Sequence, residues 1–216
     1  AEVDACLAWS GQRPVEGLHD RFAVDDHWCL VHATHVDDAE RDAMVMSGAT
    51  VGLCPTTEAN LGDGLFPAKA FLNAGGRVGI GSDSNVSVSP IEELRLLEYG
   101  QRLIHRQRAI LTSLGGSVGQ TLWTKTTTDG ALALGTKTGE IATGFKADVI
   151  VLDPCCPALI NKDNTTRMDG LVFDGNANPI TDVMVNGQWV VREGHHPLEE
   201  DSFRDFVNVC QQLEEA

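Results

Sequence analysis

Two polar side chains follow apolar segments at positions where a buried strand would end. Asp83 comes shortly after the run VGIG at 78–81, and His32 directly follows CLV at 29–31. A carboxylate at the end of a buried strand suits a hard or borderline metal ion and can accept a proton from a metal-bound water. The simpler alternative is that Asp83 caps the following loop or helix through its side-chain oxygens. The local sequence leaves both roles open.

His32 lies 51 positions before Asp83 (83 minus 32). Two barrel strands separated by one other strand would bring both side chains to one opening. A lone histidine is more often structural than catalytic, so His32 also has a simpler reading. His35 follows three positions later, but residues 37–48 have the spacing of a helix, so we expect His35 to lie outside the site.

The segment CPTTEANLGDG at 54–64 is rich in polar residues and glycine. It follows a strand-like run, and we interpret it as a loop of the kind that often shapes a substrate pocket. Glu58 is a candidate second acid there, although a solvated loop residue is the simpler interpretation. Asn60 is a further polar candidate.

Alternating strands and helices are expected to position these residues. Strand-like runs occur in 27–35, 49–55 and 77–81, about 25 residues apart. Helical spacing follows at 37–48, 66–76 and 90–111, and the chain itself opens with a helical stretch. This repeat is typical of a parallel sheet or β/α barrel, and polar residues gather after the strands, where barrel enzymes do their chemistry.

The pattern changes from about residue 136. Residues 138–154 and 180–194 alternate with the period of a strand, and Asn186–Gly187 predicts a tight hairpin turn. The closing segment 202–216 has the spacing of an amphipathic helix.

Composition excludes several classes of protein. The net charge of -15 argues against nucleic-acid binding, which needs clustered Lys and Arg. No apolar run approaches 18 residues, so we expect no membrane span, and the first residues do not resemble a signal peptide. The six cysteines lack zinc-ligand spacing and predict reduced thiols in a cytoplasmic protein. The chain has no initiator Met, which suggests a fragment.

Read together, the strand ends resemble the amidohydrolase superfamily and, within it, the formimidoylglutamate deiminases of histidine degradation. The G-x-I-x-x-G-x-x-A-D-[VIL]-x-V-L-D motif is rather specific to the superfamily. The segments that carry the resemblance are VHATH (31–35), CPTTEANLGDG (54–64), GIGSDSNVSVSPIEELRLLEYGQR (79–102), GEIATGFKADVIVLD (139–153) and DVMVNGQWVVREG (182–194).

The resemblance implies an α/β fold that is the C-terminal part of a (β/α)8 TIM-type barrel, strands six to eight, plus part of a small β-sandwich. The implied domains are a partial barrel at 1–135, a β-sandwich segment at 136–198 and a C-terminal helix at 199–216.

Functional residues also follow from the resemblance. Asp83 matches the acid after the eighth strand, which binds zinc and carries protons. His32 matches the catalytic histidine after the sixth strand. Glu58 and Asn60 match the substrate-binding loop after the seventh strand. The implied reaction is zinc-dependent hydrolysis of the formimino C=N bond of N-formimino-L-glutamate, with iron as the alternative metal.

The family's remaining metal ligands, an H-x-H pair and residues around the fifth strand, would lie upstream of Ala1. Catalytic zinc normally needs three protein ligands, so we expect this chain alone to be inactive. The full-length enzyme is expected to be a cytoplasmic homodimer with a small-molecule substrate and no nucleic-acid or membrane partner.

Two other functions stay open. One is a different amidohydrolase deaminase, acting on a heterocyclic amine or amidine. The other is a non-catalytic, truncated remnant that keeps the fold without the metal.

Overall fold

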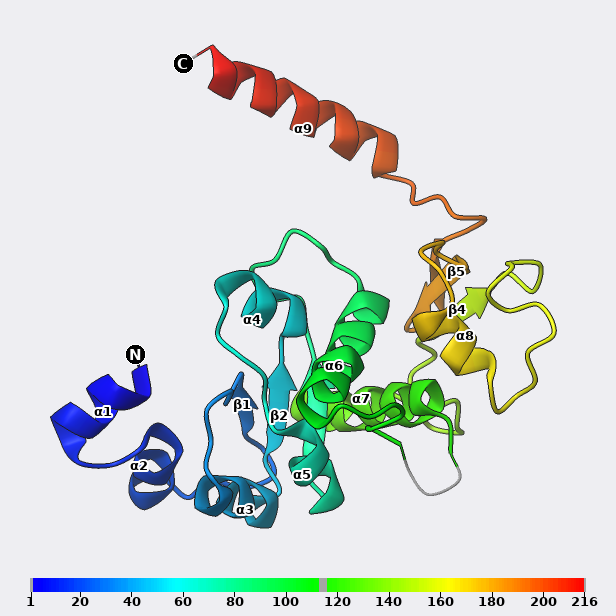
Figure 1. The fold of residues 1–216 in the computed structure, drawn as a ribbon. Coiled ribbons are helices and arrows are strands. Elements are labelled where there is room, and N and C mark those ends of the chain that lie inside the picture. Colours follow the sequence, from blue (N-terminus) through cyan, green and yellow to red (C-terminus); the bar gives the residue numbers. More distant parts are fainter. Residues whose placement is uncertain (1, 113–115, 216) are drawn as a thin grey trace.

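The computed structural model describes residues 2–112 and 116–215, which contain two three-stranded sheets (Figure 1). The first sheet comprises β1 (Cys29–Val31), β2 (Thr50–Leu53) and β3 (Arg77–Ile80), paired in parallel in that order. The three predicted strands and their parallel arrangement are therefore confirmed. Because parallel strands begin and end on the same sides, their carboxyl ends share one edge of the sheet.

Helices alternate with these strands and continue after them. Their bounds in the described residues are α1 (Glu2–Ser10), α2 (Pro14–Arg21), α3 (Asp38–Ser47), α4 (Pro55–Leu61), α5 (Ala68–Asn73), α6 (Pro90–His105), α7 (Val118–Ala133), α8 (Arg167–Phe173) and α9 (Glu199–Glu214).

Capping residues explain where the predicted helices begin and end. Asp37 accepts a hydrogen bond from the Glu40 N–H at the start of α3, and Gly48 ends that helix with a φ of +74°. Helix α6 begins with Pro90 in its first turn, as predicted. It ends at His105 rather than at 111, because Arg106 adopts a left-handed conformation.

Segment 54–64, predicted to be a loop, contains helix α4. Pro55 occupies its first position, where its fixed φ favours a helix, and Gly62 ends it with a φ of +72°. The loop prediction was wrong because Gly62 marks the end of a helix and the polar residues before it belong to that helix. Glu58 consequently lies on a helix, where it is only 4% exposed.

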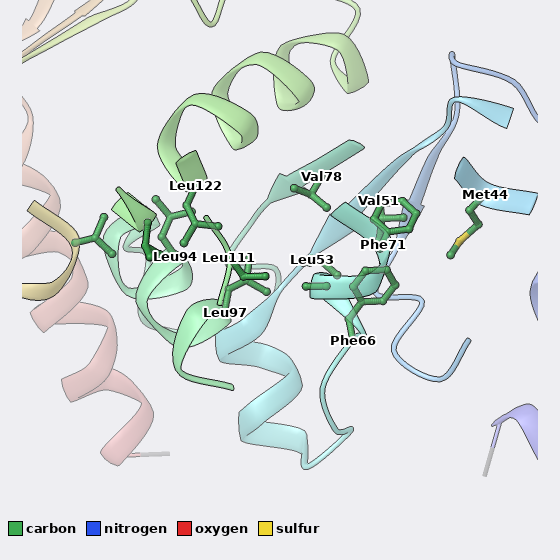
Figure 2. Close-up of a cluster of buried hydrophobic side chains, with 13 residues drawn as sticks. Met44, Val51, Leu53, Phe66, Phe71, Val78, Leu94, Leu97, Leu111 and Leu122 are labelled. Carbon is green, nitrogen blue, oxygen red and sulfur yellow. The ribbon is translucent and has the colours of Figure 1, made fainter. Parts of the chain in front are cut away.

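The main core lies between the parallel sheet and its helices. Figure 2 shows Val51, Leu53 and Val78 of the strands in one cluster with Phe66 and Phe71. Strand β2 is buried along most of its length, as its apolar run predicted, whereas both ends of β1 are exposed.

Helix α7 packs against β3 and β2. Its Asp129 side chain accepts a hydrogen bond of 3.0 Å from the Val78 N–H of β3, and Lys125 forms an ion pair of 3.0 Å with the same carboxylate. A buried carboxylate needs such partners, so this contact fixes α7 to the strand that leads to Asp83.

Thr50 on β2 offers a stability prediction. It is fully buried, and its hydroxyl has no hydrogen-bond partner among the described residues. Thr50→Val keeps the shape of the side chain and removes this unsatisfied group, so we expect the free energy of unfolding to rise by about 1 kcal/mol. Urea denaturation of the chain measures the change.

The control is Thr126→Val on α7, where the Thr126 hydroxyl donates to the Leu122 carbonyl at 2.9 Å. Losing that bond is expected to lower the free energy of unfolding by about 1 kcal/mol. Equal losses in both variants would contradict the assignment of Thr50 as unsatisfied.

The second sheet comprises β4 (Val149–Leu152), β5 (Ile180–Val185) and β6 (Gln188–Val191), all antiparallel. The predicted hairpin is confirmed, because Asn186 and Gly187 join β5 to β6 with φ angles of +48° and +79°. Only the end of the predicted strand 138–154 is a strand. Residues 136–198 form this one sheet and helix α8, so the β-sandwich stays a prediction.

Helix α9 extends away from both sheets (Figure 1) and contains no buried residue. It confirms the predicted C-terminal helix, beginning at Glu199; the last predicted residue, 216, lies outside the described part of the chain. None of the helices described is long and apolar enough to cross a bilayer.

Candidate functional site

The carboxyl ends of the three parallel strands bring the candidate residues together. His32 follows β1, Cys54 follows β2, and Asp83 follows β3. The ladder continues slightly beyond the strands, since the His32 N–H donates to the Gly52 carbonyl at 2.8 Å. The sequence prediction that His32 and Asp83 share one edge with a single strand between them is therefore consistent with this sheet order.

The backbone leaves the extended conformation at both residues. His32 has a φ of +67° and Asp83 a φ of +50°. The left-handed region is uncommon for residues other than glycine, and such conformations persist only where surrounding contacts hold them. At this edge they turn the chain sharply after the strands.

Glu58 lies against His32. Its Oε1 accepts hydrogen bonds from the Cys54 N–H at 2.9 Å and from Nδ1 of His32 at 3.2 Å. The expectation of a solvated loop acid was wrong, because α4 turns this carboxylate inward. Glu58 therefore supports His32 from the protein side, and its proposed contact with substrate has no support in this geometry.

This contact sets the roles of the two nitrogens of His32. An ionised carboxylate only accepts hydrogen bonds, so Nδ1 carries the proton when it pairs with Glu58. Nε2 is then the nitrogen available to a ligand or substrate. The side chain of His32 is 38% exposed, whereas that of Glu58 is 5% exposed. A buried carboxylate therefore holds a histidine that solvent can reach.

Asp83 is exposed at the same edge. One of its carboxylate oxygens is 3.4 Å from the Ser84 hydroxyl. The turn that carries it is tied to α4, since the Thr57 hydroxyl donates to the Ser82 carbonyl at 2.8 Å. Asp83 thus presents a carboxylate to solvent from an anchored turn.

Cys54 lies beside this pair, and its sulfur, a nitrogen of His32 and an oxygen of Glu58 lie within 4.8 Å of one another. Such a cluster could hold a metal. However, burial and then the negative charges of Glu58 and Asp83 raise the pKa of the Cys54 thiol to about 11. The geometry argues against an ion here, because Nδ1 of His32 and Oε1 of Glu58 already face each other at 3.2 Å in a hydrogen bond.

The structure does not bring the other two candidates into the site. Asn60 is exposed and lies two positions from Glu58 on α4, so it faces a different side of the helix. Its role in substrate binding stays a prediction. His35 is exposed, and its backbone carbonyl accepts a hydrogen bond from Arg13.

Sequence reasoning missed Glu93 on α6, which is 1% exposed. Its Oε2 accepts a hydrogen bond of 2.9 Å from the Thr56 N–H, and its Oε1 accepts the Thr56 hydroxyl. Burial raises the pKa of Glu93, and the bonds from Thr56 oppose that rise. The sequence feature that could have revealed Glu93 is its position beside Leu94 and Leu97. An acid on the apolar stripe of a helix is buried and therefore needs a hydrogen-bond partner inside the protein.

Comparisons with known proteins agree with this arrangement. The amidohydrolase family matches residues 1–190. Formimidoylglutamate deiminase of Pseudomonas aeruginosa is 52% identical over 98% of this chain, which covers 47% of that relative. The crystal structure of an amidohydrolase from Brucella melitensis has a TM-score of 0.91 and 44% identity, over 98% of this chain and 47% of that one.

A more distant structure shares the fold. An adenosine deaminase from Xanthomonas campestris with bound zinc has a TM-score of 0.81 and 24% identity, over 96% of this chain and 48% of that one. This chain spans about half the length of each of the proteins compared.

The donor set fits one part of a zinc site. Catalytic zinc usually takes three protein ligands and keeps one position open. Asp83 offers an exposed carboxylate at the strand edge, which could serve as one metal ligand. The carboxylate of Glu58 already accepts hydrogen bonds from the Cys54 N–H and from His32. The described residues therefore fit as contributors to a zinc site and not as the whole of it.

Proposed function

Because this chain belongs to the amidohydrolase family, we propose that it forms part of a zinc-dependent hydrolase acting on N-formimino-L-glutamate. The reaction would yield N-formyl-L-glutamate and ammonia. The observation that carries the proposal is the 52% identity to formimidoylglutamate deiminase across nearly the whole chain. The activity would belong to a longer protein, and we expect the isolated chain to be inactive because Asp83 alone would not complete a zinc site.

The finer architecture is part of the proposal. Strands β1, β2 and β3 would be strands six, seven and eight of a (β/α)8 barrel, within a domain at 1–135. Strands β4 to β6 would belong to a small β-sandwich at 136–198, followed by the helix at 199–216. We further propose that the full-length enzyme is a cytoplasmic homodimer with a small-molecule substrate.

Asp83 is the proposed proton carrier. When bound, zinc would make a water ligand acidic enough to supply hydroxide near neutral pH, and iron is the alternative metal. Asp83 would accept the proton that the water loses as its oxygen bonds to the formimino carbon. The π electrons of C=N would move to nitrogen. Asp83 would return the proton to that nitrogen, giving an amino group on the tetrahedral carbon, and would then transfer the proton of the new hydroxyl group to the same nitrogen. The C–N bond would break as the C=O bond forms, and the nitrogen would leave as ammonia.

His32 is the proposed orienting residue. Glu58 would hold Nδ1 of His32, and Nε2 would contact the polar atoms bonded to the formimino carbon once that carbon is tetrahedral. This contact would stabilise the charge that develops on those atoms. A ring fixed before the reaction does not need to reorient during it, so the buried carboxylate of Glu58 contributes through His32.

The test is a substrate comparison with the full-length enzyme. Ammonia release is measured with N-formimino-L-glutamate and, separately, with adenosine and other heterocyclic amines. We expect kcat/KM to be at least about 100-fold higher for the linear amidine, because a site that hydrogen-bonds one substrate discriminates strongly against others. Release from the heterocycles alone would favour the other deaminase function, and release from neither would contradict both.

A further inference from the structure

The turn at residues 81–87 carries Asp83, and much of it is exposed. The Gly81 N–H bonds to the Leu53 carbonyl at 3.0 Å, and the Asn85 N–H closes the turn on the Ser82 carbonyl at 3.0 Å. Between them, Asp83 holds its left-handed φ of +50°. An exposed turn in an uncommon conformation needs contacts from the rest of the fold to keep its side chain in one place.

Helix α4 supplies contacts on both sides of Asp83. The Thr57 hydroxyl, on a side chain 2% exposed, donates to the Ser82 carbonyl at 2.8 Å. That carbonyl belongs to the peptide bond that enters Asp83, so the contact fixes the plane from which the carboxylate projects. On the other side, the Asn85 amide donates to the Thr56 carbonyl at 3.3 Å.

Helix α4 is itself fixed at this point. The buried Glu93 carboxylate of α6 accepts both the N–H and the hydroxyl of Thr56. Contacts therefore run without interruption from α6, through the first turn of α4, to the turn of Asp83. A chain of buried polar contacts of this kind gives a short segment a unique position.

We propose that Thr57 is a positioning residue for Asp83, acting through the Ser82 carbonyl. Thr57 touches neither the reacting atoms nor the metal in this role. The inference rests on the proposed role of Asp83 at a zinc site. Outer contacts that orient a metal ligand are commonly worth 10- to 100-fold in metal affinity or rate.

The experiment uses the full-length enzyme with Thr57→Val and Thr57→Ser. Valine has nearly the shape of threonine and no hydroxyl, whereas serine keeps the hydroxyl. In Thr57→Val we expect the zinc dissociation constant, measured by competition with a chelator, to rise about tenfold. We expect kcat to fall about tenfold with KM unchanged within about twofold, and Thr57→Ser to recover both values to within about threefold.

The matched control is Thr126→Val, which removes another buried threonine hydroxyl bonded to a carbonyl, on α7 away from the strand edge. It is expected to leave zinc affinity and kcat within about twofold of wild type. Equal losses of zinc affinity in Thr57→Val and Thr126→Val would overturn the proposal. So would a folded Thr57→Val enzyme with wild-type zinc affinity.

Asn85→Ala keeps the test decisive if Thr57→Val does not fold. It removes the second contact to α4, together with the bond of 2.8 Å that the Asn85 Oδ1 accepts from the Ser87 N–H, and it leaves the core unchanged. We expect zinc affinity to fall about threefold, and wild-type affinity would then overturn the proposal. A wild-type enzyme that binds zinc but releases no ammonia from N-formimino-L-glutamate would contradict the proposed substrate, while the zinc measurements would still test Thr57.

Discussion

Asp83→Asn in the full-length enzyme is expected to lower kcat/KM by about 1,000-fold or more. The amide keeps the size of the side chain but cannot accept a proton at neutral pH, and it replaces an anionic oxygen with a neutral one. General acid–base catalysis typically contributes 10²- to 10⁴-fold, and loss of an anionic ligand adds to that. Steady-state ammonia release and the zinc content of the purified enzyme measure the two effects.

Asp205→Asn provides the matched control for this variant. Asp205 is exposed on α9, away from both sheets, and its substitution makes the same change in net charge. We expect its kcat/KM to stay within about twofold of wild type, since isolated surface charges contribute little. An Asp83→Asn enzyme that retained both zinc and wild-type turnover would remove Asp83 from the site.

Glu58→Gln is expected to lower kcat/KM by about 10- to 100-fold while the enzyme keeps its zinc. The substitution preserves volume, but it removes the negative charge beside His32 and adds an N–H group that can face the donor at Nδ1. Loss of a carboxylate that fixes the tautomer of a catalytic histidine is costly for the rate. Kinetics and metal analysis together separate this variant from Asp83→Asn, which is expected to lose zinc as well.

A control for Glu58→Gln is Glu140→Gln, because Glu140 is exposed in the segment after α7. It should behave as wild type in both measurements. If Glu58→Gln also turned over at the wild-type rate, the contact between Glu58 and His32 would be structural only.

The arrangement of strands was predictable because its causes are local. Each strand is a short apolar run, helices of recognisable period recur between the strands and after β3, and parallel pairing then sends His32 and Asp83 to one edge. The hairpin at Asn186–Gly187 was predictable for the same reason, since the two residues favour the left-handed turn it requires.

Other elements depend on contacts that no local pattern displays. Helix α7 contains a run of threonines, which are poor helix formers, yet Thr126, Thr127 and Thr128 donate to carbonyls in the preceding turn. Packing of the helix on β3, with Asp129 bonded to Val78, stabilises it despite that composition. Propensity is a weak guide where tertiary contacts decide.

The role of Glu58 was hidden for a related reason. In sequence it is a polar residue among glycine, threonine and asparagine, which is typical of a solvated loop. Its burial follows from the direction in which α4 leaves β2, and that direction is set by Pro55 and by the contact of Thr56 with Glu93. Only the folded arrangement shows that the acid reaches His32.

The single Glu58 oxygen that accepts from both the Cys54 N–H and His32 has a consequence for motion. Local opening of the junction between β2 and α4 would break both bonds together. The protection of the Cys54 backbone amide and the orientation of the His32 ring would then fluctuate as one cooperative unit. Hydrogen exchange at Cys54 would therefore report on how firmly the His32 ring is held.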